Sequence, residues 1–171
     1  MRLSSRVLIG EEQLRLRVEA MAQAIALDTP DGRSLSVIAL MDGAFMFCAD
    51  LVRRLPMRVH LAFVPLLSVR RGGTPSRMTL PEGFPVSGAD LLVVEDILDT
   101  GLTLDAVRRR LAGLGPASVR MAVLLDKPAR REIEVRPEYV GFRVEDRWVV
   151  GYGLDSEGLY RNLPYISYVE P

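Results

Sequence analysis

The sequence predicts an α/β domain with a central, mainly parallel sheet flanked by helices, because apolar runs of strand length alternate with amphipathic helical segments. The runs of strand length lie at residues 37–40, 59–65, 91–94 and 119–125. Apolar residues three or four positions apart, as on one face of a helix, mark residues 11–27, 45–55 and 104–114. Strands that alternate with helices in this order are expected to pair in parallel.

The remaining segments predict shorter elements and one long loop. Residues 139–142 and 148–150 resemble short strands, and the proline-containing tail, residues 163–171, is expected to pack back on the domain. Residues 68–90 are rich in Arg, Gly, Pro, Ser and Thr and show no sustained periodicity. Because loops this long are usually functional or disordered, we expect a mobile active-site loop here, within a single domain spanning residues 1–171.

Composition and charge narrow the class of protein. A domain near 171 residues buries roughly 70% of its unfolded surface and forms a core without disulfides. The 22 basic residues balance 22 acidic ones, so the chain lacks the basic excess of a dedicated nucleic-acid binder. A single cysteine, Cys48, on the apolar face of a helical segment, favours a reducing compartment. Without an apolar signal segment or a long apolar run, we expect a cytoplasmic protein with no membrane association.

The segment that carries the chemistry leaves the apolar run at 91–94 and opens the helix at about Thr103. Ligands of open α/β sheets bind at the carboxyl ends of the strands, and backbone N–H groups at a helix N-terminus favour an anion. Gly101 would let a phosphate approach the backbone, and the hydroxyls of Thr100 and Thr103 would add donors. This segment therefore predicts a phosphate site.

Three carboxylates flank this expected phosphate site, where they would repel an anion unless they bind something else. Glu95 and Asp96 could accept hydrogen bonds from vicinal ribose hydroxyls and hold Mg²⁺, which prefers a few carboxylate and substrate oxygens together with retained waters. Asp99, farther into the turn, is placed for proton transfer. The plain alternative is a solvated turn with a threonine cap.

Residues 94–103, VEDILDTGLT, resemble the phosphoribosyl-diphosphate-binding motif of type I phosphoribosyltransferases, and more closely that of the hypoxanthine-guanine subgroup. Four further stretches resemble the same family in the same order: residues 44–51, 124–130, 149–155 and 160–163. The resemblance implies the type I phosphoribosyltransferase fold, with a small hood formed by terminal segments. It also implies Mg²⁺-dependent transfer of the phosphoribosyl group from phosphoribosyl diphosphate to N9 of hypoxanthine or guanine, giving IMP or GMP and diphosphate.

The resemblance also implies a role for each matched residue of the turn. Glu95 and Asp96 would bind the ribose hydroxyls with Mg²⁺ nearby, and Asp99 would be the base that takes or steers the proton at purine N7. The 5′-phosphate would be cradled by Asp99, Thr100, Gly101, Leu102 and Thr103.

The later stretches imply the binding site for the purine. Lys127 would donate to O6, Trp148 would stack on the ring and the backbone of Val149 would meet the base edge. Asp155 would lie near a second Mg²⁺ and the guanine 2-amino group, and Arg161 would contact diphosphate. Each residue has a plain alternative: a solvated loop lysine, an ordinary core tryptophan, an aspartate that caps a turn and an arginine paired with a surface acid.

The sequence departs from the family at two places. Asp42-Gly43 replaces the usual Lys-Gly or Arg-Gly, whose backbone binds diphosphate in relatives, often through a cis peptide. An aspartate there keeps the backbone but adds a negative charge beside an anion. The mobile loop lacks the family's Ser-Tyr pair, although Arg70 and Arg71 could meet the diphosphate instead.

Three other functions stay open at this point. The chain could be a non-catalytic regulator that binds nucleotides, or it could carry the same chemistry to another 6-oxo heterocycle. Asp99-Thr100-Gly101 also spells the aspartic protease signature, although the helical run at 104–114 argues against the all-β fold that this requires. The expected partners are small-molecule substrates, not nucleic acid, and relatives suggest a homodimer or homotetramer.

Overall fold

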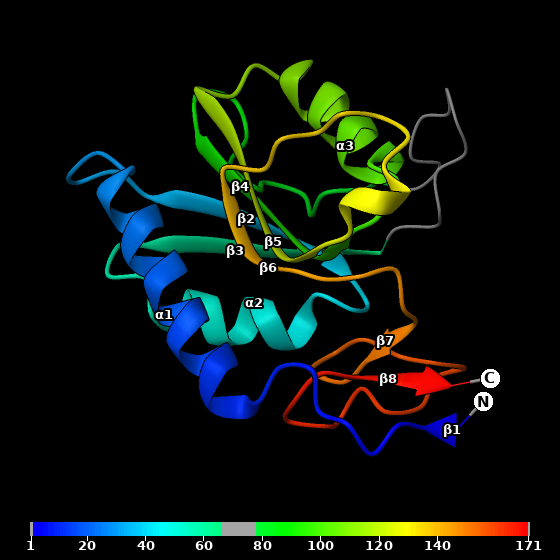
Figure 1. The fold of residues 1–171 in the computed structure, drawn as a ribbon. Helices are drawn as coiled ribbons and strands as arrows, with labels where there is room; N and C mark the ends of the chain where they lie inside the picture. The colour runs from blue at the N-terminus through cyan, green and yellow to red at the C-terminus, as the bar shows by residue number, and fades with distance from the viewer. Residues whose placement is uncertain (1, 66–77, 171) are drawn as a thin grey trace.

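The computed structural model describes residues 2–65 and 78–170. Five parallel strands form the central sheet, in the order β3-β2-β4-β5-β6 (Figure 1). Their bounds are Val59–Pro65 for β3, Leu35–Met41 for β2, Asp90–Leu98 for β4, Ser118–Asp126 for β5 and Tyr139–Arg143 for β6. The predicted α/β class and parallel pairing are confirmed. This architecture removes the aspartic protease interpretation, which needs an all-β fold.

Helices cover both faces of the sheet. Helices α1 (Glu11–Leu27) and α2 (Phe45–Val52) lie on one face, and α3 (Leu102–Ala112) lies on the other (Figure 1). Because successive strand residues point to opposite faces, Val37 of β2 belongs to the core beneath α1 and α2, whereas Ile38 belongs to the core beneath α3. Both faces of the central sheet are therefore covered by a hydrophobic core.

A small antiparallel sheet at one end of the molecule is the hood that the resemblance implied. Strand β8 (Ser167–Glu170) pairs with β1 (Arg2–Leu3) on one side and with β7 (Val149–Val150) on the other. The tail thus packs back on the molecule as predicted, and both ends of the chain meet at the hood (Figure 1). Residues 144–148, between β6 and β7, connect the central sheet to the hood.

Several element boundaries differ from the sequence prediction. Strand β4 continues to Leu98 instead of ending at Val94, because Glu95 and Ile97 stay in register with Val123 and Leu125 of β5. Helix α2 ends at Val52 and α3 at Ala112, so the predicted helical residues Leu55 and Leu114 lie beyond them. Leu55 is nevertheless buried, whereas Leu114 is exposed between Gly113 and Gly115. Apolar spacing therefore indicated the helices but not their last turns.

The predicted loop at 68–90 is described only in part. Residues 68–77, with Arg70 and Arg71, lie outside the described residues. From Met78, which is buried against the α3 core, residues 78–89 lead into β4 through turns at Gly83 and Gly88. Within the described part of the chain, no helix is long and apolar enough to cross a membrane.

Candidate active site

Predicted site residues follow three neighbouring strands at the same edge of the central sheet. Asp42 follows β2, Asp99 follows β4 and Lys127 follows β5. Because these strands pair in parallel, their carboxyl ends bring the three residues to one edge, where open α/β sheets bind ligands. The five-stranded topology therefore gathers residues that are far apart in the sequence.

Two adjacent, half-buried acids lie near the end of β4. The backbone N–H of Asp96 donates to Glu95 Oε1 (3.3 Å), and the N–H of Ile97 donates to Asp96 Oδ1 (2.9 Å). Burial raises the pKa of Glu95 well above its ordinary range, and the negative charge of Asp96 raises it further. Burial also raises the pKa of Asp96, although hydrogen bonding and the charge of Arg161 act in the opposite direction. A bound cation or sugar hydroxyls would favour the ionised acids.

Glycines let the loop after β2 approach these acids closely. A Cβ on Gly43 would lie 1.6 Å from Asp96 Oδ2, closer than any side chain could come. A Cβ on Gly153 would lie 2.2 Å from the carbonyl oxygen of Gly43, so a third segment packs on the same place. The peptide bond between Met41 and Asp42 is cis.

The turn before α3, where a phosphate cradle was predicted, depends on a glycine. Gly101 has a φ of 88°, a conformation that favours glycine, and a Cβ there would lie 2.4 Å from the carbonyl oxygen of Ile133. The carbonyl oxygen of Thr100 accepts hydrogen bonds from the N–H groups of Glu132 (2.9 Å) and Ile133 (3.1 Å). The segment after β5 thereby holds the turn and the N-terminus of α3 in place. We call Gly43, Glu95, Asp96 and the turn 99–103 the phosphate-side cluster.

A network of charges surrounds Asp99 and Lys127. Asp99 Oδ1 lies 3.2 Å from Arg130 Nε, and Asp146 Oδ1 lies 3.7 Å from Arg130 Nη1 and 3.9 Å from Lys127 Nζ. Lys127 Nζ also donates to the carbonyl oxygen of Arg147 at 2.5 Å. Lys127 is only 6% exposed, which rules out a solvated loop lysine, and burial lowers its pKa although Asp99 and Asp146 oppose this.

Trp148 and Asp155 are joined by a hydrogen bond next to this network. Trp148 is 58% exposed, so it is not an ordinary core residue, and its Nε1 donates to the carbonyl oxygen of Asp155 (3.1 Å). Val149 is buried in β7 beside it. The carboxylate of Asp155 accepts from the N–H of Gly158 (2.7 Å), so Asp155 does cap a turn, as the plain alternative expected. We call Lys127, Arg130, Asp146, Arg147 and Trp148 the base-side cluster.

Arg161 links the hood region to the loop after β2. Its guanidinium donates to the carbonyl oxygen of Gly153 (2.6 Å) and pairs with Asp155 (3.0 Å). Asp42 Oδ2 lies farther away, 3.9 Å from Arg161 Nη2, and the Asp42 side chain is 73% exposed. Asp42, the residue that departs from the family, therefore faces Arg161, which was predicted to contact diphosphate.

Sequence reasoning missed several residues at this edge. Arg130 ends one of the stretches that resemble the family, but its ion pair with Asp99 was not expected. Asp146 and Arg147 belong to a charged run before Trp148, and such runs usually lie in solvent. Gly153 could have been found from the run Gly151-Tyr152-Gly153, because closely spaced glycines often mark close backbone approaches.

The acidic residues suit a site that shares its metal ion with a substrate. Within residues 2–65 and 78–170, no three His, Cys, Asp or Glu side chains are grouped closely enough to hold a metal ion by themselves. Glu95 and Asp96 form a pair, while Asp155 is engaged with Arg161. Mg²⁺ commonly takes one or two carboxylates and fills its remaining positions with water and phosphate oxygens, so the adjacent pair fits it.

The fold and these contacts define an α/β protein whose sheet edge joins an acid-bearing, glycine-containing turn to a buried lysine and an exposed tryptophan. Comparison with known families agrees, because residues 10–157 match the phosphoribosyl transferase domain. The chain therefore belongs to the phosphoribosyltransferase family.

Individual relatives resemble the chain over nearly its whole length. Hypoxanthine phosphoribosyltransferase of Haemophilus influenzae is 40% identical over 168 residues, which cover 95% of this chain and 94% of that protein. Hypoxanthine-guanine phosphoribosyltransferase of Staphylococcus epidermidis is 38% identical, covering 94% and 91%. The crystal structure of a Bacillus anthracis hypoxanthine-guanine phosphoribosyltransferase with HEPES in its active site matches with a TM-score of 0.88 at 37% identity, covering 99% of both chains.

Proposed function

We propose that the chain is a purine-salvage enzyme that transfers the 5-phosphoribosyl group from phosphoribosyl diphosphate to N9 of hypoxanthine or guanine. The observation that carries this proposal is the shared sheet edge, at which the phosphate-side and base-side clusters meet around Asp99. The relatives described above catalyse this class of reaction according to their names, which supports the same activity here.

The phosphate-side cluster binds the sugar phosphate in this proposal. The turn 99–103, which includes Leu102, holds the 5′-phosphate, and Glu95 and Asp96 hold the ribose hydroxyls and Mg²⁺. Bound Mg²⁺ would neutralise charge on the diphosphate leaving group. Arg161 and the backbone of Asp42 and Gly43 contact the same diphosphate. Breaking the bond between C1 and oxygen leaves positive charge on the ribose and negative charge on diphosphate, so oppositely charged groups at both positions lower the barrier.

The base-side cluster selects and orients the purine. Lys127 donates to O6, which favours a 6-oxopurine over adenine, whose 6-amino group is itself a donor. Trp148 stacks on the ring, and the backbone of Val149 meets its edge, while Asp155 contacts the guanine 2-amino group and would help to hold a second Mg²⁺. Asp99 accepts the proton from N7 as N9 attacks C1, and such a positioned base typically contributes about 10²–10⁴-fold.

A base panel tests this proposal. Purified protein is incubated with phosphoribosyl diphosphate, Mg²⁺ and one base at a time: hypoxanthine, guanine, xanthine, adenine or a pteridine. We expect IMP and GMP to form, with adenine inactive. If nucleotide forms only with another 6-oxo ring, that ring replaces hypoxanthine and guanine as the proposed substrate. If IMP binds but no base is turned over, the result supports the nucleotide-binding regulator instead.

We also propose finer properties that suit this activity. The protein works with Mg²⁺ in the cytoplasm as a homodimer or homotetramer, and residues 1–171 form one domain. Chelation by EDTA should abolish transfer, and light scattering should give the mass of two or four chains.

A further inference from the structure

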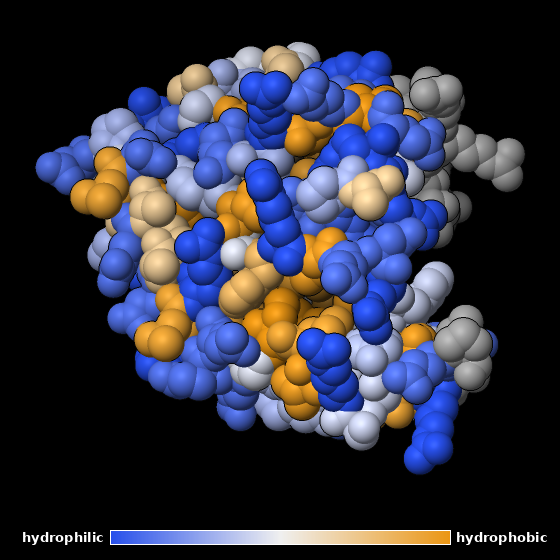
Figure 2. All heavy atoms as spheres, in the orientation of Figure 1, coloured by the Kyte–Doolittle hydropathy of each residue, from blue (hydrophilic) through white to orange (hydrophobic). Residues whose placement is uncertain are grey.

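A cavity lies between the central sheet and the hood. It has a volume of about 350 Å³, within the range of small-molecule sites. It is lined by Arg6, Leu8, Ile9, Gln13, Phe142, Arg143, Val144, Glu145 and Arg147. None of these residues was predicted to bind substrate, and Arg147 alone belongs to the base-side cluster. Figure 2 shows an apolar hollow with a hydrophilic rim on the face that α1, β6 and the hood share.

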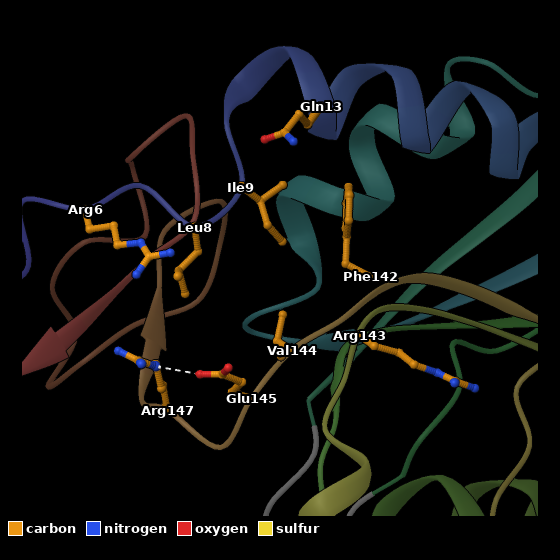
Figure 3. A pocket seen from close by; sticks show the side chains of 9 residues that line it. All are labelled: Arg6, Leu8, Ile9, Gln13, Phe142, Arg143, Val144, Glu145 and Arg147. Atoms are coloured by element: carbon orange, nitrogen blue, oxygen red, sulfur yellow. Dashed lines mark hydrogen bonds and ion pairs between the residues drawn. The ribbon is translucent and has the colours of Figure 1, made fainter.

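The lining combines an apolar floor with cationic groups. Leu8, Ile9, Phe142 and Val144 face one space, and the guanidinium groups of Arg6 and Arg147 lie at its hood side (Figure 3). Arg147 pairs with Glu145 at 3.2 Å. Among the described residues, no carboxylate pairs with the Arg6 guanidinium. An exposed apolar hollow is a common mark of a binding site, and the surplus positive charge favours an anion.

The cavity is connected to the base-side cluster through one residue. The side chain of Arg147 lines the cavity, and its carbonyl oxygen accepts the hydrogen bond from Lys127 Nζ (2.5 Å). Trp148 follows Arg147 directly. A ligand that pairs with the Arg147 guanidinium would therefore bind the same residue whose carbonyl oxygen accepts from Lys127.

We propose that this cavity is an effector site for a small aromatic anion, whose ring packs on Leu8, Ile9, Phe142 and Val144 while its charged group pairs with Arg6 and Arg147. Binding there is coupled to Lys127 through the Arg147 carbonyl. The binding step stands on the cavity alone, while an effect on purine turnover rests on the proposed function. Since coupling is reciprocal, a purine nucleotide will change the affinity for the anion by the same factor.

Calorimetric titration with 2-naphthoate tests the site. We expect saturable binding of one molecule per chain. Arg6→Glu should weaken it about tenfold or more, because a charge-assisted contact becomes a repulsion. The matched control Arg110→Glu makes the same charge change at an exposed position on α3 and should bind as the wild type does. Leu8→Trp fills the cavity without changing its charge and should abolish binding, with circular dichroism as the check on folding.

Equal naphthoate affinity in wild type, Arg6→Glu and Leu8→Trp, or no saturable binding at all, would overturn the site.

The coupling has a separate readout, because Lys127 is the only lysine of the chain. Its rate of reductive methylation, followed by mass spectrometry, should change at least about twofold when naphthoate saturates the wild type. An unchanged rate would overturn the coupling. Neither readout depends on turnover, so both remain informative if the base panel yields no nucleotide.

Discussion

The two clusters at the active edge are built in different ways. The phosphate-side cluster is held by regular elements and by glycines that allow contacts too close for a side chain, as at Gly43 and Gly101. The base-side cluster is held by side-chain ion pairs and by hydrogen bonds from side chains to carbonyl oxygens, as at Arg130, Lys127 and Trp148. The phosphate-side cluster should therefore lose activity when atoms are added to it. The base-side cluster should lose activity when individual charges are removed. Asp99 lies where the two meet.

The largest effect is expected at the meeting point. Asp99→Asn keeps the size of the side chain but removes the base, so the turnover number should fall by about 10²–10⁴-fold while phosphoribosyl diphosphate still binds. Steady-state kinetics together with calorimetric binding of phosphoribosyl diphosphate measure the two quantities. Unchanged turnover would remove Asp99 from the role of base.

A single added methyl group tests the rigidity of the phosphate-side cluster. In Gly43→Ala the new Cβ would meet Asp96 Oδ2 at 1.6 Å, so Asp96 must move. A displacement of about 1 Å at a site of this kind costs roughly 10²-fold in kcat/KM. Gly113→Ala is the matched control, because φ there is −67° and the nearest atom to a Cβ is 3.5 Å away. Equal activity of the two variants would mean that Asp96 can move aside without loss of activity, so that the phosphate-side cluster is not rigid.

Loss of a charge tests the base-side cluster. Lys127→Met keeps the aliphatic stem but removes the donor to O6, which should raise KM for hypoxanthine about ten- to hundredfold and leave KM for phosphoribosyl diphosphate nearly unchanged. In the wild type, IMP should protect this only lysine from acylation. A rise in both KM values would show that the clusters are not separable.

The smallest effect is expected at Asp42, whose side chain is largely exposed. Asp42→Lys restores the family's positive charge near diphosphate, and because the contact is solvent-screened, affinity for diphosphate should rise only about two- to fivefold. Asp42→Asn separates loss of the negative charge from gain of the positive one. Calorimetry that finds the same affinity in all three proteins would mean that the side chain points away from the ligand.

The same contrast explains what the sequence could predict. Residues 94–103 are contiguous, and their apolar, acidic and glycine positions indicated the strand, the turn and the helix that form the phosphate-side cluster. The base-side cluster depends on pairs such as Lys127 with Arg147 and Arg130 with Asp99. These contacts are made by loops after different strands, and local patterns carry no information about which loop side chains will meet.

Boundaries were harder to predict for a related reason. Glu95 and Asp96 have low strand propensity, yet β4 continues through them because β5 supplies the hydrogen-bonding register. Tertiary pairing thus overrode the local signal at the most functional part of the chain. The cavity beside the hood could not be predicted from the sequence either, because its lining comes from two separate stretches, residues 6–13 and 142–147.

The only tryptophan of the chain, Trp148, permits the most direct test that the two clusters form one substrate site. Its emission should change saturably as IMP is added, because the purine stacks on the indole while the 5′-phosphate occupies the turn 99–103. Phosphoribosyl diphosphate with Mg²⁺ should reverse the change by competing for that turn. Emission that IMP leaves unaltered, or an IMP signal that phosphoribosyl diphosphate fails to reverse, would contradict this account.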